Sequence, residues 1–341
     1  MEKLTIHGKS GISQLLVGEL VQHISAYLPE TDVIVITGQQ ISNLYSTILQ
    51  PYKTITIGQG EDVKSLTTVS YIYDELIKLG ADRSTFILGV GGGIVCDIAG
   101  FVASTYLRGL RFGFVPTTLL AQVDASVGGK NGVNFHGLKN RIGTINQPDF
   151  VLCDPSFFAT LPEKEIRCGL GEVVKHALIA DAELFSYIEN HVEAILSLNP
   201  DVMKRLVLDS IRIKSAVVNR DEREQGERRI LNFGHTVGHI IEEHSTFSHG
   251  EAISVGMVTA AKISQQLGLL SEEAVQRIIN LLEKLGLPVH SPIPATDIVK
   301  TLSMDKKREG DNLHFIVLNA IGHADIKSIS ISDLQHLILN S

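Results

Sequence analysis

The chain has few cysteines and no pair of them spaced to hold a metal. Its 341 residues include Cys96, Cys153 and Cys168, and none of these forms a CxxC motif. An odd count without that spacing argues against a disulfide framework and against a cysteine zinc site. The pattern favours reduced thiols, and we expect a cytoplasmic protein.

The sequence also lacks the usual marks of nucleic-acid-binding, secreted or membrane proteins. The formal net charge is −8 and no basic block offsets it, which argues against nucleic acid as the partner. The first residues, MEKLTIHGKS, do not have the basic-then-apolar order of a signal peptide. The long apolar segment 86–104 contains Asp97 and a run of glycines, so we predict a buried strand, a turn and a helix instead of a membrane span.

What the sequence does contain is a change of pattern near residues 155–160. Before it, short apolar runs alternate with helical segments, which predicts a mostly parallel sheet covered on both faces. After it, helices dominate. We therefore expect a Rossmann-like α/β nucleotide-binding domain over residues 1–157 and a mainly α-helical metal- and substrate-binding domain over residues 158–341.

Individual elements follow from local signals. Strands are expected at residues 33–37, 53–57, 85–90, 111–116 and 150–154, with a helix over 61–80. Thr160 and Glu163 have capping-box spacing, Asn199-Pro200 predicts a helix start, and Ser271 begins a helix that stops at Gly286. A small hairpin and a short helix should end the chain.

A glycine turn follows the third of these strands, in the segment LGVGGGIVCD (88–97). Such a turn lets the backbone approach a pyrophosphate at a helix N-terminus. The spacing is not GxGxxG, however, and a tight strand–helix turn needs small residues anyway. From the turn alone, the two interpretations are about equal.

Histidines gather in NFGHTVGHIIEEHSTFSHG (232–250). His235 and His239 would share one helical face, and His249 follows a turn and can approach from another direction. The glutamate of an HExxH motif is missing, because Thr236 follows His235. His244, next to Glu242 and Glu243, is more typical of a solvated face. Glu172 is the best carboxylate candidate, with Lys175 and His176 on its helical face, although a plain surface pair would give the same spacing.

Cations in weakly charged, glycine-rich surroundings suggest an anionic ligand. Lys130 lies between Gly129 and Asn131 and is the hardest to explain as a surface charge. Further candidates are Lys139, Asn140, Lys214, Arg228 and the DKKREG segment (305–310).

Taken in order, these segments resemble the 3-dehydroquinate synthase family of sugar-phosphate cyclases. The resemblance covers nearly the whole chain, through GEDVKS, GVGGGIVCDIAGFVASTYLRG, VPTTLLAQVDASVGGKNGVN, LKNRIGTINQP, TLPEKE, GLGEVVKH, RRILNFGHTVGH, HGEAISVGM and MDKK.

The resemblance implies roles for individual residues. A zinc or cobalt ion would be held by Glu172, His235 and His249, while His239 would face the substrate phosphate. Asp124, Lys175 and Lys214 would line the hydroxyl and metal region, and Arg228 would meet the carboxylate. The residues that would hold the substrate phosphate are Lys130, Asn140, Asn232, His239 and either Lys306 or Lys307. Arg108 would reach into a neighbouring subunit's site, which implies a homodimer.

For NAD, the resemblance implies contacts from Glu61, Lys64, Gly92, Gly93, Asp97, Thr117, Thr118, Lys130, Lys139 and Thr160, with Lys139 also counted among the catalytic residues. The substrate would be a phosphorylated keto-acid, 3-deoxy-D-arabino-heptulosonate 7-phosphate, converted to 3-dehydroquinate and phosphate. One departure stands out: many members carry Asp or Asn after the strand at 33–37, and this chain has Gly38. NAD remains the expectation because no arginine is nearby.

Three rival interpretations remain. A metal- and NAD-dependent alcohol or glycerol dehydrogenase would share the two-domain plan, but it would not need the cations at 130, 139, 175 and 214. Sister cyclases have substrates without a carboxylate, so Arg228 and the DKK lysines favour dehydroquinate synthase. A catalytically inactive binding protein is disfavoured because the expected polar residues are present.

Overall fold

The computed structural model describes residues 1–18, 21–304 and 312–341. Two compact units are formed, the first by Met1–Leu161 with Lys214–Arg223 and the second by Pro162–Ile213 with Glu224–Ser341. Helix α8 (Pro200–Arg220) therefore contributes its first part to the second unit and its last part to the first. Lys306 and Lys307 lie outside the described residues.

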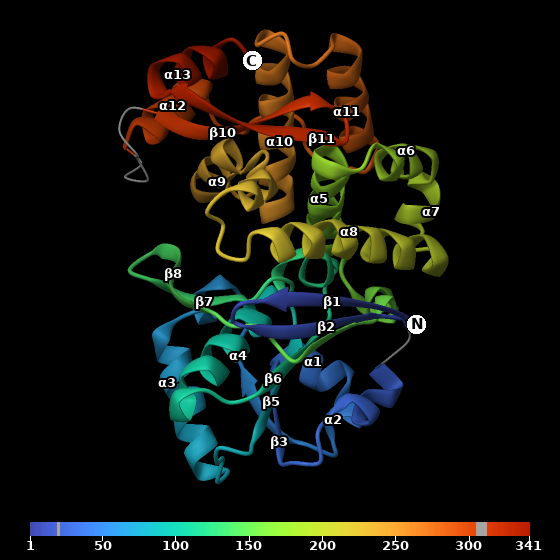
Figure 1. Ribbon diagram of the computed structural model, residues 1–341, viewed down its shortest axis with the longest axis vertical. Coiled ribbons are helices and arrows are strands. Elements are labelled where there is room, and N and C mark those ends of the chain that lie inside the picture. The colour runs from blue at the N-terminus through green and yellow to red at the C-terminus, as the bar shows by residue number, and fades with distance from the viewer. Residues whose placement is uncertain (19–20, 305–311) are drawn as a thin grey trace. The chain divides into compact units, whose positions relative to one another are not determined.

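The first unit is built on a seven-stranded sheet with the order β1-β2-β9-β6-β5-β3-β4 (Figure 1). Its strands are β1 (Glu2–Gly8), β2 (Gly11–Val17), β3 (Val33–Gly38), β4 (Lys53–Ile57), β5 (Phe86–Gly91), β6 (Phe112–Pro116) and β9 (Phe150–Cys153). All neighbouring pairs are parallel except β1 with β2. The predicted parallel α/β sheet is thus confirmed, and the N-terminal hairpin β1–β2 was not anticipated.

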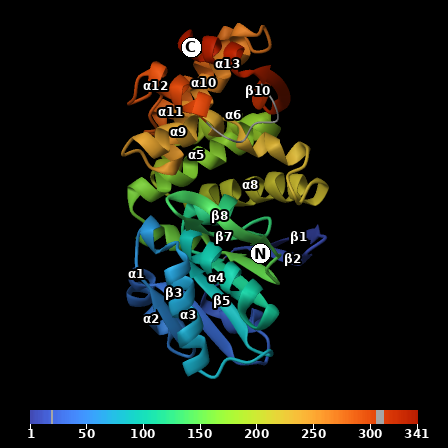
Figure 2. The same cartoon turned by 90° about the vertical axis from the view of Figure 1, so that its left-hand side faces the viewer.

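Both faces of this sheet are covered, as the apolar strands predicted. Alternation along β3 sends Val33 and Val35 to one face and Ile34 and Ile36 to the other, and all four are buried. Helices α1 (Gln39–Leu44) and α2 (Ser46–Leu49) lie on one side, and α3 (Leu66–Lys78) and α4 (Gly93–Thr105) lie on the opposite side (Figures 1 and 2).

A second hairpin of the first unit carries several predicted site residues. Strands β7 (Lys130–Phe135) and β8 (Leu138–Ile145) pair antiparallel and pack on α3 and α4. Shorter turns complete the unit, with 3-10 geometry at Val21–Tyr27, Glu61–Val63, Tyr106–Arg108 and Pro155–Thr160 and π geometry at Ala121–Ala125.

The second unit is mainly helical, as predicted. Its helices besides the first part of α8 are α5 (Glu163–Ala180), α6 (Ala182–Asn190), α7 (Val192–Leu196), α9 (His235–His244), α10 (His249–Gln266), α11 (Glu272–Lys284), α12 (Ala295–Met304) and α13 (Ile331–Leu339), with a 3-10 turn at Glu227–Asn232. The antiparallel hairpin β10 (Asn312–Ala320) and β11 (His323–Ser330) packs on α10 and α5, and α13 follows it. The predicted terminal hairpin and helix are confirmed.

Two local predictions need correction. The capping box at Thr160 is wrong: α5 begins at Glu163 after Pro162, with no side-chain hydrogen bond at the cap. Thr160 ends the preceding 3-10 turn, so its Oγ1 hydroxyl instead donates a hydrogen bond to Phe157 O at 3.2 Å. The helix expected over 61–80 starts only at Leu66, because Ser65 caps it by accepting a hydrogen bond from Thr68 N.

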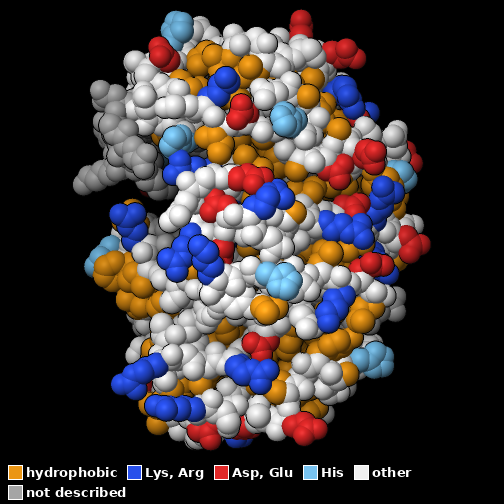
Figure 3. All heavy atoms as spheres, in the orientation of Figure 1, with side chains coloured by type: hydrophobic (Ala, Val, Ile, Leu, Met, Phe, Trp, Pro, Cys, Tyr) orange, Lys and Arg blue, Asp and Glu red, His pale blue; other side chains and the backbone are white. Residues whose placement is uncertain are grey.

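Segment 86–104 forms a strand, a turn and a helix, as expected. No helix of the described residues is long and apolar enough to cross a membrane. On the face shown in Figure 3, basic and acidic side chains are interspersed.

Candidate active site

Three predicted metal ligands converge in the second unit. Nε2 of His235 lies 3.7 Å and Nε2 of His249 lies 3.5 Å from Glu172 Oε1. One donor atom from each of the three residues lies within 4.8 Å of the others. Glu172 is fully buried on α5, whereas His235 and His249 are the first residues of α9 and α10 and keep 13% and 27% of their side chains exposed.

Close packing of α5 on α10 brings Glu172 to His249. A Cβ on Gly250 would lie 2.1 Å from Cys168 O, and one on Gly171 would lie 2.9 Å from Gly250 O. Because only glycine lacks this atom, the two helix backbones can touch at the point where the metal candidates face each other. Ser248 and Glu251 form a capping box at the start of α10, which fixes the first turn that carries His249.

Glycines also bring α9 against α10. A Cβ on Gly256 would lie 2.0 Å from Gly234 O, and one on Gly238 would lie 2.7 Å from Ile253 Cδ1. Gly234 has a φ of 79° as the residue before α9, a conformation that favours glycine. This turn directs His235 toward Glu172.

In both imidazoles, Nδ1 also has a partner, in addition to the contact that Nε2 makes with Glu172. Nδ1 of His235 lies 3.1 Å from Phe233 O, and Nδ1 of His249 lies 3.2 Å from Glu242 Oε2. An Nδ1–H donor leaves the Nε2 lone pair directed to the side where Glu172 lies.

The pKa values of the two histidines are shifted in opposite directions. Burial lowers the pKa of His235 to about 3, so this ring is neutral. Burial also lowers the pKa of His249, but hydrogen bonds to Glu172 and Glu242 outweigh it and raise the pKa to about 9. A metal ion bound by His249 would have to displace the proton that this raised pKa favours.

Two imidazole nitrogens and one carboxylate form a donor set that suits zinc or a similar divalent ion with one position left open. Lys175 forms a buried ion pair with Glu172 Oε2, whereas the contacts of the two histidines are with Glu172 Oε1. His239 is exposed and lies outside this group of donors, although its ring centroid is 5.0 Å from that of His235. The predicted exposure of His244 is confirmed, whereas Glu242 is largely buried and not part of a solvated face.

In the first unit, the glycine turn joins β5 to α4. Gly92 precedes α4, which begins without a side-chain cap, and a Cβ on Gly91 would lie 2.7 Å from Val95 Cβ. The glycines thus serve tight strand–helix packing, and they leave a bare helix N-terminus of the kind that binds phosphate. Gly38 lies at the end of β3, and a Cβ added there would lie 3.9 Å from Val95 Cγ2, an ordinary van der Waals contact.

Beside this turn, four predicted residues form one polar network. Lys64 Nζ donates to Asp97 Oδ2 and to Asn140 Oδ1, each at 2.5 Å. Asn134, which the sequence analysis did not select, donates to Glu61 Oε1 at 2.8 Å and accepts from Asn140 N at 2.9 Å. It holds Asn140 in a left-handed conformation with a φ of 51°. No local pattern in the sequence indicated this role, because the partners of Asn134 lie 6 and 73 residues away in the chain.

Asp97 gives this network a measurable pH dependence. Burial raises its pKa to about 6, with Lys64 acting in the opposite direction. The folded state thus holds its proton more tightly than the unfolded chain, and the free energy of unfolding should fall by roughly 2–3 kcal/mol as pH rises from about 4 to about 6. Chemical denaturation across this range should show that loss in the wild type and in the exposed control Asp62→Asn, but not in Asp97→Asn. Equal slopes in all three proteins would contradict the assignment.

Asp124 and Lys214 also meet in the first unit. Lys214 Nζ, 7% exposed in its side chain, donates to Asp124 Oδ1 at 2.7 Å and to Asp124 O at 2.5 Å. The lysine comes from the last part of α8 and the aspartate from the π turn. Two residues 90 positions apart in the chain are therefore brought together as a fixed charge pair.

The remaining predicted residues are placed as follows. In the second unit, Arg228 is buried and Asn232 Nδ2 donates to Glu224 Oε1. Glu224 was not selected from the sequence, and its φ of 58° is uncommon for a residue with a side chain. In the first unit, the exposed side chains are Arg108, Lys130, Lys139 and Thr160, Thr118 is half-buried and Thr117 is buried.

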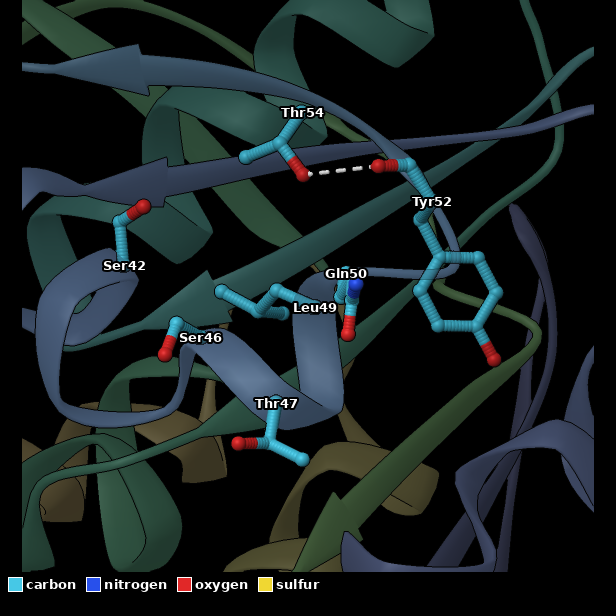
Figure 4. Close-up of a pocket in the computed structure, with 7 residues that line it drawn as sticks. All are labelled: Ser42, Ser46, Thr47, Leu49, Gln50, Tyr52 and Thr54. Atoms are coloured by element: carbon cyan, nitrogen blue, oxygen red, sulfur yellow. Dashed lines mark hydrogen bonds between the residues drawn. The ribbon is translucent and has the colours of Figure 1, made fainter.

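A pocket of about 380 Å³ lies elsewhere on the first unit, by α1, α2 and the start of β4 (Figure 4). Its lining is Ser42, Ser46, Thr47, Leu49, Gln50, Tyr52 and Thr54. No predicted site residue is among them, and the lining holds no carboxylate, amine or imidazole. We therefore do not assign the chemistry to this pocket.

Comparison with known proteins identifies the family. A family model for the N-terminal part of 3-dehydroquinate synthase matches residues 54–168, and one for its C-terminal part matches residues 169–308. The 3-dehydroquinate synthase of Halorhodospira halophila is 43% identical over 315 residues, covering 90% of this chain and 88% of that protein. That of Geobacter metallireducens is 44% identical over 288 residues, covering 83% and 79%.

Solved structures agree with this fold. A 2-deoxy-scyllo-inosose synthase, complexed with carbaglucose-6-phosphate, NAD+ and Co2+, superposes with a TM-score of 0.89 at 28% identity, covering all of both chains. A 2-epi-5-epi-valiolone synthase from Streptomyces hygroscopicus with NAD+ and Zn2+ gives 0.87 at 25%, covering 100% and 97%. A probable glycerol dehydrogenase from Sinorhizobium meliloti gives 0.65 at 15%, covering 96% and 95%, and so shares the fold alone. The chain belongs to the 3-dehydroquinate synthase family.

Proposed function

We propose that this chain converts 3-deoxy-D-arabino-heptulosonate 7-phosphate to 3-dehydroquinate and phosphate, using NAD and a divalent metal. It is a lyase in which the cofactor is regenerated at each turnover. The observation that carries the proposal is the convergence of Glu172, His235 and His249, in a chain whose relatives at 43–44% identity are 3-dehydroquinate synthases.

The metal is zinc or cobalt, and its ligands are Glu172, His235 and His249. When bound, it would supply Lewis acidity for the substrate hydroxyls. Lys175 holds Glu172 from the far side through their buried ion pair, so the carboxylate is fixed in charge and position. Burial keeps His235 neutral, and Phe233 O holds its tautomer.

NAD, when bound, would take up a hydride from the substrate and return it within the same turnover. The N-terminus of α4 and the glycine turn are suited to its pyrophosphate. Glu61, Lys64 and Asp97 lie in one network at that turn, joined to the β7–β8 hairpin through Asn134 and Asn140. The nucleotide and substrate residues of the first unit therefore share a common support.

Arg228, which is buried, is suited to the substrate carboxylate. We keep Lys130, Asn140, Asn232 and His239 as residues for the substrate phosphate, as predictions from the sequence. The Asp124–Lys214 pair supplies a fixed donor and acceptor for hydroxyls. We keep Arg108 as a residue for a neighbouring subunit, together with the homodimer and the cytoplasmic location, as predictions from the sequence.

The role of His239 distinguishes this site from that of a metal-dependent dehydrogenase. Because its side chain lies outside the Glu172 group, His239→Ala should leave zinc affinity within about twofold of the wild type while weakening phosphate-analogue binding at least tenfold, close to the cost of a hydrogen bond to a charged group. Calorimetric titration with zinc and then with a phosphonate analogue measures both. Loss of zinc would make His239 a ligand and favour the dehydrogenase arrangement.

The function itself is tested by phosphate release with NAD far below the substrate concentration. Release from the heptulosonate 7-phosphate, without lasting NADH absorbance, is the expected result. NADH accumulating with glycerol would indicate a dehydrogenase, and release from glucose 6-phosphate or sedoheptulose 7-phosphate alone would indicate a sister cyclase.

A further inference from the structure

We propose that Glu242 is a positioning residue that holds the His249 imidazole by its Nδ1–H, so that Nε2 is presented to the metal beside Glu172. The inference rests on the proposed metal site, which it extends by a residue that does not itself bind the ion.

The contacts of the His249 ring carry the proposal. Nδ1 lies 3.2 Å from Glu242 Oε2, and Nε2 of the same ring lies 3.5 Å from Glu172 Oε1. Each ring nitrogen thus has its own carboxylate, one on α9 and one on α5. A ring held at Nδ1 cannot rotate without losing that contact, so its orientation is set before any metal arrives.

Glu242 is less exposed than the residues that follow it in the sequence. Its side chain is 14% exposed, whereas Glu243 and His244, which follow it on α9, are exposed. An acid on a solvated face would be expected to turn outward. This one instead faces the first residue of α10 across the turn that the Ser248–Glu251 capping box fixes.

The two histidine ligands are held differently. His235 has a neutral backbone partner, Phe233 O, at 3.1 Å from its Nδ1. His249 has a carboxylate, which increases the electron density at Nε2 and makes it the stronger donor to a metal. Glu242 therefore adjusts the affinity of the site as well as its geometry.

Direct ligation by Glu242 is the competing interpretation, because donors of His239, Glu242 and His249 also lie within 4.8 Å of one another. A metal there would bind His249 through Nδ1 and displace the hydrogen bond to Glu242 Oε2. The Nε2 atom of His249, which faces Glu172, would then bind no metal. The convergence of the Nε2 atoms of His235 and His249 on the same Glu172 oxygen favours the positioning role.

The experiment measures zinc and cobalt affinity by competition with a chelator, in the full chain and without substrate. Glu242→Gln removes the negative charge while nearly keeping the shape of the side chain. We expect this substitution to weaken metal binding about 10–100-fold, with the stoichiometry unchanged at one ion per chain. Glu243→Gln, one residue on and exposed, is the matched control and should bind as the wild type does. Equal affinity in the two variants would overturn the proposal, as would a lower stoichiometry in Glu242→Gln alone.

A second measurement needs no variant. In the zinc-loaded wild type, the 15N resonances of His249 should show a protonated Nδ1 and a metal-bound Nε2, and a metal-bound Nδ1 would overturn the proposal. A failure of the proposed metal site can be distinguished from a failure of the positioning role. If Glu172→Gln retains metal, the proposed ligand set is wrong. If Glu172→Gln loses metal but Glu242→Gln binds it with wild-type affinity, only the positioning role is contradicted.

Discussion

Replacing Glu172 by glutamine is expected to weaken zinc or cobalt binding by more than about 100-fold, beyond the effect of losing a residue that only orients a ligand. The amide keeps the shape of the carboxylate but removes the charge that two imidazoles approach within 3.7 Å. Metal content after dialysis and affinity by chelator competition measure the loss, and phosphate release should fall with occupancy.

The same substitution should also destabilise the chain, because Lys175 then keeps a buried charge without its partner. Breaking a buried ion pair in this way costs about 3–5 kcal/mol. Glu172→Gln combined with Lys175→Met should recover most of that stability without recovering metal. Glu163→Gln, on the exposed first turn of α5, serves as the control and should change neither stability nor metal binding appreciably. Full metal occupancy in Glu172→Gln would contradict the ligand assignment.

Gly250→Ala is expected to have the second largest effect. Its Cβ would lie 2.1 Å from Cys168 O, a backbone atom that no rotamer change can move. Helices α5 and α10 must then separate, which should cost about 1–3 kcal/mol or more in the free energy of unfolding. Because Glu172 and His249 lie on these two helices, metal affinity should fall as well.

Denaturant unfolding and chelator competition on the same protein test this coupling. Lys262→Ala, which truncates a partly exposed side chain on α10, is the control and should change neither quantity appreciably. A Gly250→Ala chain with wild-type stability would show that the helix contact is not required. A destabilised chain that binds metal normally would show that the contact supports the fold without setting the site.

Much of the fold could be predicted from local patterns. The strands at Val33–Gly38 and Phe86–Gly91 are apolar on both faces, and a parallel sheet covered on both sides is the arrangement that buries them. The capping box at Thr160 failed because a four-residue spacing does not show that a 3-10 turn already uses the threonine hydroxyl. The N-terminal hairpin was not anticipated, although residues 3–7 (KLTIH) alternate polar and apolar side chains as a half-buried strand does.

The site was only partly accessible to sequence reasoning. Spacing alone favoured His235 with His239, and the resemblance replaced His239 by His249; the structure groups His235 and His249 with Glu172. Contacts between distant residues left no local signal. Asn134 to Glu61 and Glu242 to His249 depend on how strands and helices pack, and that packing depends on glycines whose importance is visible only when the neighbouring backbone is in place.

The proposed activity is tested most directly by the ratio of phosphate released to NAD supplied, measured with the heptulosonate 7-phosphate in metal-loaded protein. We expect many phosphates per NAD, no lasting NADH absorbance, and loss of phosphate release when a chelator removes the metal. Phosphate limited to one equivalent per NAD, or release that survives in metal-free protein, would contradict the proposed activity.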